Sequence, residues 1–255
     1  MCNLKIFVNG HNLYVEHTGP ENGPTVVLLH HGLGSVRAWR GQVPAFVEAG
    51  YRVVAYDRWG YGESDERTGL EIPIFTSDLM DLSSLLDQFK IQRATLLGHS
   101  DGGTIALYYA ARKPERVSSL VTVAAHIYVE PMMEPSILGI KQAFETDERF
   151  RTGMQYAHRE KSVAVFHNWF DGWHRQESLA WDIRPLLGQI RCPALIVQGE
   201  QDEYATPQHA MDIAQSIPGA TLWLIPGARH MLLQENAAEF NARILRFLKD
   251  KFTDE

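Results

Sequence analysis

The chain contains 255 residues, of which 45% are hydrophobic, and it carries a formal net charge of −7. This size is enough for one domain with a large core and an inserted subdomain, and the negative charge argues against a nucleic-acid partner. No apolar stretch approaches the roughly 20 residues that a membrane-spanning helix needs, and the first residues lack the layout of a signal peptide. A cytoplasmic protein with no membrane association is therefore expected.

Taken in chain order, short β-branched runs alternate with longer amphipathic runs, which is the pattern of parallel βαβ units. The chain opens with a hairpin that turns at Asn9 and Gly10. The predicted strands cover residues 4–8, 13–17, 25–30, 52–56, 94–97, 117–124, 194–198 and 221–225, and the predicted helices cover residues 74–89, 103–111 and 235–252.

The alternation breaks between residues 126 and 185, which are rich in Met, Trp, Phe and charged side chains. Helical patterns over residues 136–145 and 163–173 predict a helical insertion there. We therefore expect a core domain made of residues 1–125 and 186–255, and a helical cap made of residues 126–185.

Cysteine usage and metal motifs give little indication of a cofactor. The two cysteines, Cys2 and Cys192, lie far apart in sequence, and free thiols are favoured although a disulfide between them stays open. The chain has no CxxC pair and no HExxH helix. We predict neither a metal site nor a cofactor.

The chemistry begins at residues 98–103, which read GHSDGG and match the pattern G-x-S-x-G between a predicted strand and a predicted helix. A strand that turns directly into a helix forces its middle residue into a strained conformation with positive φ. Neighbouring side chains would collide there, so Gly98 and Gly102 are needed. The turn would hold the Ser100 hydroxyl at the carboxyl edge of the sheet, above a helix N-terminus that favours negative charge.

These residues, with three other segments, resemble the α/β-hydrolase superfamily over essentially the whole chain. Residues 57–64 (DRWGYGES) look like its D-x-R-G-x-G-x-S loop, with Trp59 shifting the arrangement. Residues 30–34 (HHGLG) look like its oxyanion loop, residues 199–202 like its acid-bearing strand end, and residues 227–230 like its histidine loop. The resemblance implies an α/β-hydrolase fold, with a mostly parallel sheet, helices on both faces and a helical cap.

A serine hydroxyl needs a base that takes its proton, and imidazole is suited to this at neutral pH. Among 11 histidines, His230 is the best placed, because it follows the last predicted strand and a turn at residues 226–227. His99 is interpreted as packed structure. The acid that orients the imidazole is predicted to be Asp202, because the family places its acid three residues past Gly199.

Glu200 and Glu203 are close enough in sequence to compete with Asp202 for this role. The oxyanion hole needs two backbone N–H donors. The resemblance implies Asp101 for one and Leu33 for the other, while the doubled histidine leaves Gly32 open as the second donor. His30 and His31 as a metal-binding pair are a weaker alternative, since no third ligand is apparent.

Asp101 is the unusual residue of the nucleophile turn, because most relatives carry an apolar or neutral residue there. Its carboxylate either accepts hydrogen bonds at the helix start or pairs with a cationic group of the substrate. The Ser-Asp pair resembles that of amino-acid-ester (valacyclovir-type) hydrolases. His126, Trp169 and Trp173 are further candidates for substrate binding, and the aromatic side chains of the cap would also form its own core.

The leading hypothesis is a serine hydrolase that cleaves a small or medium carboxylic ester through an acyl-enzyme, with a small molecule as its partner. Lactone opening, C–C bond hydrolysis and perhydrolysis use the same triad in this superfamily and stay open. A ligand receptor or binding protein that retains the triad is a different class of alternative. A homodimer is one option that the sequence does not decide.

Overall fold

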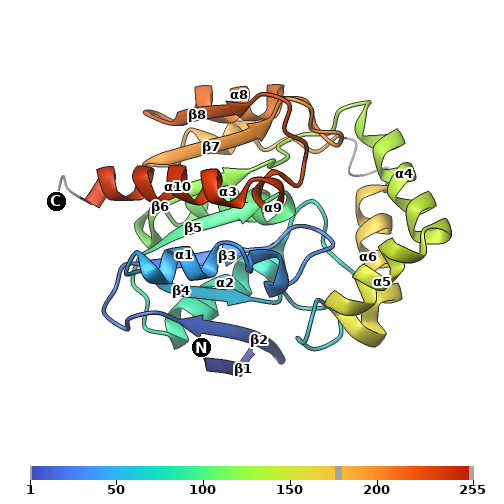
Figure 1. Cartoon of the computed structure of the whole chain (residues 1–255), viewed down its shortest axis with the longest axis horizontal. Coiled ribbons are helices and arrows are strands. Elements are labelled where there is room, and N and C mark those ends of the chain that lie inside the picture. The colour runs from blue at the N-terminus through green and yellow to red at the C-terminus, as the bar shows by residue number, and fades with distance from the viewer. Residues whose placement is uncertain (1, 176–179, 253–255) are drawn as a thin grey trace.

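An eight-stranded sheet forms the centre of the computed structural model, which describes residues 2–175 and 180–252 (Figure 1). The strand order is β1-β2-β4-β3-β5-β6-β7-β8, with β1 and β2 antiparallel to their neighbours and all later strands parallel. The strands are β1 (Cys2–Val8), β2 (His11–Thr18), β3 (Thr25–Leu29), β4 (Arg52–Tyr56), β5 (Ala94–His99), β6 (Val117–Val123), β7 (Ala194–Gly199) and β8 (Thr221–Ile225).

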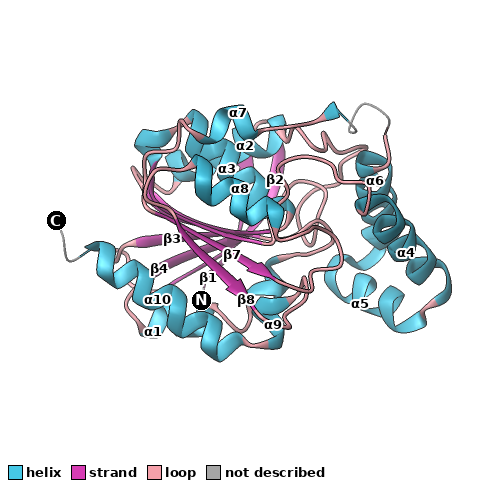
Figure 2. Cartoon of the chain, turned by 90° about the horizontal axis from the view of Figure 1, so that it is seen from above, coloured by secondary structure: helices cyan, strands magenta, loops and turns pink. Residues whose placement is uncertain are grey.

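Helices cover both faces of this sheet (Figure 2). On one face lie α1 (Val43–Glu48), α9 (Leu232–Glu235) and α10 (Ala237–Phe252), and on the other lie α2 (Thr76–Gln88), α3 (Asp101–Arg112), α7 (Arg184–Leu187) and α8 (Gln208–Ser216). Within the described ranges, no helix combines the length and the apolar character needed to cross a membrane.

The inner parallel strands, β3 to β7, are largely apolar because both of their faces are buried, whereas the edge strand β8 is partly exposed. In β3, Val26 and Leu28 pack into the core on the α1–α10 side, while Val27 and Leu29 pack into the core on the α2–α3 side. The predicted fold class is confirmed, and each predicted strand is present to within two residues at either end.

Three helices extend beyond the carboxyl edge of the sheet: α4 (Met133–Thr146), α5 (Glu148–His158) and α6 (Ser162–Trp173) (Figure 1). Their apolar side chains are continuous with the core on the α2–α3 side of the sheet, and among them the rings of Phe144 and Phe166 stack 3.9 Å apart. Tyr128 and Asp182 form an antiparallel bridge, so the chain leaves and re-enters the sheet region at neighbouring points. We refer to α4, α5 and α6 as the cap helices.

The order of the strands determines where a site can form. The chain runs outward from β3 to β4 and then returns to place β5 on the other side of β3, which is a topological switch point. Open α/β sheets bind ligands in the crevice at the carboxyl ends of strands next to such a point. The loops after β3, β5, β6, β7 and β8 all reach this edge, and they carry residues 30–34, Ser100, His126, Asp202 and His230.

Candidate active site

Ser100 occupies the turn between β5 and α3 in the strained conformation that the sequence predicts, with φ of 53° and ψ of −121°. A Cβ atom on Gly98 would lie 2.1 Å from the carbonyl oxygen of Gly102, and one on Gly102 would lie 2.0 Å from that of Leu29. Both positions therefore require glycine. The Ser100 N–H donates to the Val123 carbonyl at 2.8 Å, which anchors the turn to β6.

His230 is bonded to Asp202. Its Nδ1 lies 2.9 Å from Oδ2 and 3.1 Å from Oδ1 of this carboxylate. The carboxylate also accepts the N–H of Tyr204 and the side-chain amide of Gln198, each at 2.8 Å. Burial opposes ionisation of Asp202, but the His230 ring and the hydrogen bond from the Tyr204 N–H outweigh burial and lower the pKa of Asp202 below its ordinary value.

Glu203, the alternative candidate for the acid that orients His230, does not bond the His230 ring. It accepts the backbone N–H of His230 at 3.1 Å and pairs with Arg229 at the same distance. Glu203 therefore holds the main chain of the histidine loop, whereas Asp202 holds the ring. The structure brings Ser100 and His230 together as lining residues of one cavity.

His99 takes part in this arrangement through a polar contact that the sequence did not indicate. Its Nε2–H donates to the carbonyl oxygen of His230 at 3.0 Å, across 131 positions of sequence. Burial lowers the pKa of His99 well below its ordinary value, so the ring is neutral and adds no charge beside His230. His99 thus fixes the backbone that carries the candidate base.

The loop after β3 is held in place by two neutral histidines. Nε2 of His30 accepts the Arg58 N–H, so its Nδ1–H donates to the carbonyl of His31 at 2.8 Å. His158, from the cap helix α5, accepts the Gly62 N–H at Nδ1 and donates from Nε2 to the Leu33 carbonyl at 3.0 Å. Burial lowers the pKa of His158 to about 4. The cap therefore clamps the predicted oxyanion loop directly.

Both candidates for the second oxyanion donor, Leu33 and Gly32, line the cavity beside Ser100 and Asp101. A Cβ atom on Gly32 would lie 2.1 Å from Nε1 of Trp169, so any other residue there would force the Trp169 side chain to move.

In the part of the chain that the structure describes, no group of three or more His, Cys, Asp or Glu side chains could hold a metal ion.

Asp101 is buried, and its side chain faces the cap and the interior. Its Oδ1 accepts the Trp173 indole N–H at 3.2 Å, while its Oδ2 lies 3.9 Å from Nη2 of Arg58. Oδ2 has no hydrogen-bond partner among the described residues. Burial raises the pKa of Asp101 to about 6, against the opposing effect of Arg58. The Asp101 carboxylate thus contacts the side chains of Trp173 and Arg58. These contacts differ from the hydrogen bonds to backbone N–H groups at the helix start that were one of its two expected roles.

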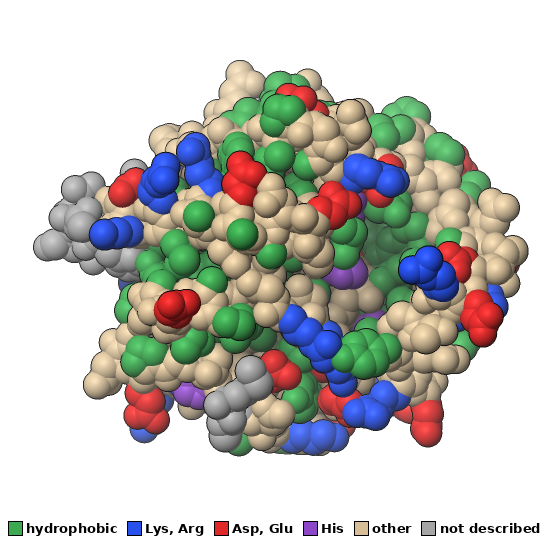
Figure 3. Space-filling view, viewed as in Figure 1, with side chains coloured by type: hydrophobic (Ala, Val, Ile, Leu, Met, Phe, Trp, Pro, Cys, Tyr) green, Lys and Arg blue, Asp and Glu red, His purple; other side chains and the backbone are tan. Residues whose placement is uncertain are grey.

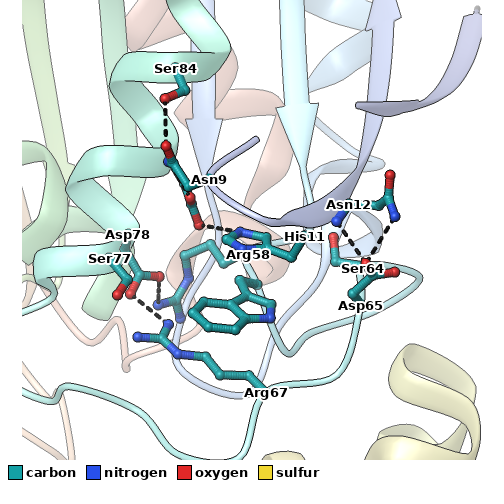
Figure 4. A network of polar contacts seen from close by, with 12 residues as sticks. Asn9, His11, Asn12, Arg58, Ser64, Asp65, Arg67, Ser77, Asp78 and Ser84 are labelled. Atoms are coloured by element: carbon teal, nitrogen blue, oxygen red, sulfur yellow. Dashed lines mark hydrogen bonds and ion pairs between the residues drawn. The ribbon is translucent and has the colours of Figure 1, made fainter. Parts of the chain in front are cut away.

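Arg58 links Asp101 to a buried polar network around the start of α2 (Figure 4). Arg58 donates from Nη1 to Asp78 at 3.1 Å, and Arg67 donates to the other oxygen of Asp78 at 3.1 Å. Arg67 in turn pairs with Glu71, which is partly exposed. Charges of alternating sign therefore run from the protein surface to the wall of the cavity.

The cavity has a volume of about 240 Å³ and lies between the sheet edge and the cap helices. Figure 3 shows histidine atoms, in purple, at the bottom of a hollow in the surface. The predicted binding residues His126, Trp169 and Trp173 all line the cavity. Sequence reasoning missed the apolar wall from α4, although its members Met133, Ile137 and Ile140 follow the i, i+4, i+7 spacing of one helix face.

Several known hydrolases are similar to this chain over most of its length. A family model described as the alpha/beta hydrolase fold matches residues 24–180. The serine hydrolase BPHL of Homo sapiens is 33% identical over 254 residues, which cover 98% of this chain and 87% of that protein. The 2-hydroxy-6-oxo-6-phenylhexa-2,4-dienoate hydrolase of Burkholderia cepacia is 26% identical, with 89% of this chain and 88% of that protein covered.

Among solved structures, the enol-lactonase from Burkholderia xenovorans LB400 has a TM-score of 0.77 and 25% identity. The alignment covers 96% of this chain and all of the other one. The expectation of an enzyme is confirmed by these relatives, which are hydrolases by name. A family model that matches more than half of the chain, and a relative that covers nearly all of it, show that this protein belongs to the α/β-hydrolase family.

Proposed function

We propose that this protein hydrolyses a small or medium carboxylic ester through an acyl-enzyme on Ser100. The observation that carries the proposal is the hydrogen bond of His230 to Asp202, in which the His230 ring belongs to the wall of the cavity that Ser100 also lines. A hydroxyl on a strained turn, an imidazole and an orienting carboxylate are the parts of a serine-hydrolase triad. Here they come from the ends of β5, β8 and β7.

In the proposed reaction, Ser100 Oγ attacks the ester carbonyl while His230 takes the hydroxyl proton. The negative charge on the carbonyl oxygen is met by the N–H of Asp101 and by that of Leu33, with Gly32 as the alternative. Collapse of this intermediate expels the alcohol, which receives its proton from His230. A water molecule, deprotonated by His230, then attacks the acyl-enzyme, and the carboxylic acid leaves as His230 returns this proton to Ser100 Oγ. None of these steps needs a metal or a cofactor.

The direct test uses a short-chain p-nitrophenyl ester and a fluorophosphonate. We expect a burst of one p-nitrophenolate per active site followed by slower turnover, and a single phosphonate adduct on the peptide that contains Ser100. A protein that merely binds ligands would be labelled without turnover. An adduct on any other residue would contradict the proposal.

A panel of different substrates distinguishes ester hydrolysis from the other reactions that the same serine could catalyse. One relative is named as a 2-hydroxy-6-oxo-6-phenylhexa-2,4-dienoate hydrolase, and one solved structure is named as an enol-lactonase. The panel therefore includes a vinylogous diketone and an enol-lactone. Perhydrolysis is tested by adding hydrogen peroxide to the ester assay. Turnover of the diketone or the lactone well above that of every ester would redirect the proposal to that chemistry.

We further propose that Asp101 binds a cationic group of the substrate, as in an amino-acid ester. The carboxylate lines the cavity, and its Oδ2 has no hydrogen-bond partner among the described residues. Arg58 favours its ionised form, and Asp78 in turn offsets the charge of Arg58. A buried carboxylate whose Oδ2 has only the distant ion pair with Arg58, at 3.9 Å, suits an ammonium group, because charge-assisted hydrogen bonds are stronger than neutral ones.

This subsite predicts a pH-dependent selectivity. Because burial raises the pKa of Asp101 to about 6, the carboxyl is protonated below that pH and ionised above it. We expect the kcat/KM of an alanine ester, divided by that of the isosteric isobutyrate ester, to rise several-fold from about pH 5 to about pH 6.5. The substrate amine stays protonated over this range, and any titration common to both reactions cancels in the ratio.

The matched control is Asp101→Asn, which keeps the backbone N–H and an oxygen that can accept from Trp173. In this variant the ratio should be low and independent of pH. A ratio that is the same in both proteins, or that falls as the pH rises, would rule out the cation subsite without affecting the proposal for Ser100.

The small-molecule substrate, the cytoplasmic location and the homodimer stay predictions.

A further inference from the structure

His126 directly follows the end of β6, and its ring forms part of the cavity wall. The ring lies parallel to that of His230, with 5.9 Å between centroids and 9° between planes, and edge-on to Trp173 at 5.6 Å. Thr104 donates its hydroxyl to the His126 carbonyl at 2.8 Å, which fixes the backbone. His126 is thus held beside the candidate base at the edge where the reaction would occur.

The ring of His126 lacks the contacts that buried histidines normally make. His126 is 5% exposed, and neither ring nitrogen has a hydrogen-bond partner among the described residues. The buried rings of His30, His99 and His158 each make at least one hydrogen bond to the protein. A buried polar group without a partner destabilises the fold, and an apolar side chain of the same size would avoid this loss. A ligand that occupies the cavity would supply the missing partner.

The charges around His126 limit which ligand group this can be. Burial, with the nearby rings of His209 and His230, lowers the pKa of His126 to about 3, so the ring offers one donor and one acceptor and no charge. An anionic group would meet the Asp101 carboxylate in the same cavity, and an ammonium group would be drawn to that carboxylate instead. An uncharged oxygen fits a neutral imidazole best.

We propose that His126 is a specificity-determining residue that hydrogen-bonds an uncharged oxygen substituent of the substrate, a hydroxyl or a ketone, next to the scissile ester. The cavity would then bind substrate at two polar points, Asp101 and His126, within walls that are otherwise largely apolar, such as Met133, Ile137 and Phe150. This inference rests on the proposed function in one respect, since it takes Ser100 as the site of reaction.

The test compares p-nitrophenyl esters that differ only by a hydroxyl in place of a methyl group. The pairs are lactyl against isobutyryl, and 3-hydroxybutanoyl against 3-methylbutanoyl. In at least one pair we expect the wild-type enzyme to prefer the hydroxy ester. His126→Phe should lower kcat/KM for that ester by about tenfold to a hundredfold and leave its isostere nearly unchanged. His126→Gln, which keeps a donor and an acceptor, should restore part of the preference.

The control variant is His167→Phe, an exposed cap histidine that does not line the cavity described above, and it should leave every ratio unchanged. An equal loss on both members of each pair in His126→Phe would show a structural role and overturn the inference. No hydroxy preference in either wild-type pair would overturn it as well.

A binding measurement separates this inference from the proposed function. The amides that correspond to the four esters are titrated calorimetrically into Ser100→Ala protein, with and without His126→Phe. Weaker binding of the hydroxy amide alone in the double variant would support the role of His126, whatever the turnover experiments show. Equal affinity of hydroxy and methyl amides in the presence of His126 would contradict it.

Discussion

Replacing Ser100 by alanine is expected to lower kcat for a short-chain ester by about a million-fold. The hydroxyl would be the only nucleophile in the reaction, so the remaining rate reflects binding and the oxyanion donors alone. Stability should change little, because alanine carries the same Cβ atom at the same φ and the backbone contacts to Val123 and Thr104 do not involve the hydroxyl. The measurements are steady-state kinetics and a thermal unfolding curve.

Ser84→Ala is the matched control for Ser100→Ala. Ser84 lies on α2 and donates to Asn9 in the network of Figure 4, away from the cavity, so its loss removes a hydroxyl without touching the reaction. This variant should keep full activity and the full burst. If Ser100→Ala retained a substantial part of the wild-type kcat, another nucleophile would be responsible and the triad would be assigned wrongly.

The sheet could be predicted from the sequence because each buried strand appears as a run of apolar residues that are neighbours in the chain. A strand covered on both faces reads as a largely unbroken apolar run, and β4, which is such a strand, begins and ends at the predicted residues. The edge strand β8 also has the predicted bounds, although its first two residues are exposed. The hairpin between β1 and β2 turns at Asn9 and Gly10, which both have positive φ, as the dipeptide predicts. These features depend on neighbours in sequence and little else.

Four α-helices of the described chain escaped prediction: α1, α5, α7 and α9. Helices α1, α7 and α9 have six, four and four residues, which is too short for a helical period to stand out. Helix α5 buries only Met154 and His158 among its 11 residues, so it lacks an apolar stripe. The start of α3 was placed two residues late, because the glycines of the turn hid a helix that begins at Asp101.

Within the site, the sequence indicated which residues carry the chemistry but could not supply their partners. The strand ends locate Ser100 and His230, whereas the contact of His158 with Leu33 joins residues 125 positions apart. Only three-dimensional packing creates such a contact. The two roles open for the Asp101 side chain likewise could not be weighed before Trp173 and Arg58 were seen beside it.

The carboxylate that orients His230 could not be identified from the sequence alone, because Glu200, Asp202 and Glu203 follow one strand within four residues. Asp202→Asn is expected to lower kcat by about ten-thousand-fold. The carboxylate accepts from Nδ1 of His230, and an asparagine amide in its place would favour the wrong tautomer and no longer stabilise the imidazolium. Glu203→Gln should have a much smaller effect, because Glu203 bonds the backbone N–H of His230. Kinetics with a short-chain ester at neutral pH provide the measurement.

A stability measurement distinguishes loss of the ionised carboxylate from general misfolding. Folding lowers the pKa of Asp202, so its ionised form stabilises the protein above the unfolded pKa of about 3.9, and this contribution disappears as the pH falls through the folded pKa. The difference in unfolding free energy between wild type and Asp202→Asn should therefore shrink in acid. A difference that stays constant with pH, or a loss of activity in Glu203→Gln as large as that in Asp202→Asn, would show that Asp202 is not the acid of the triad.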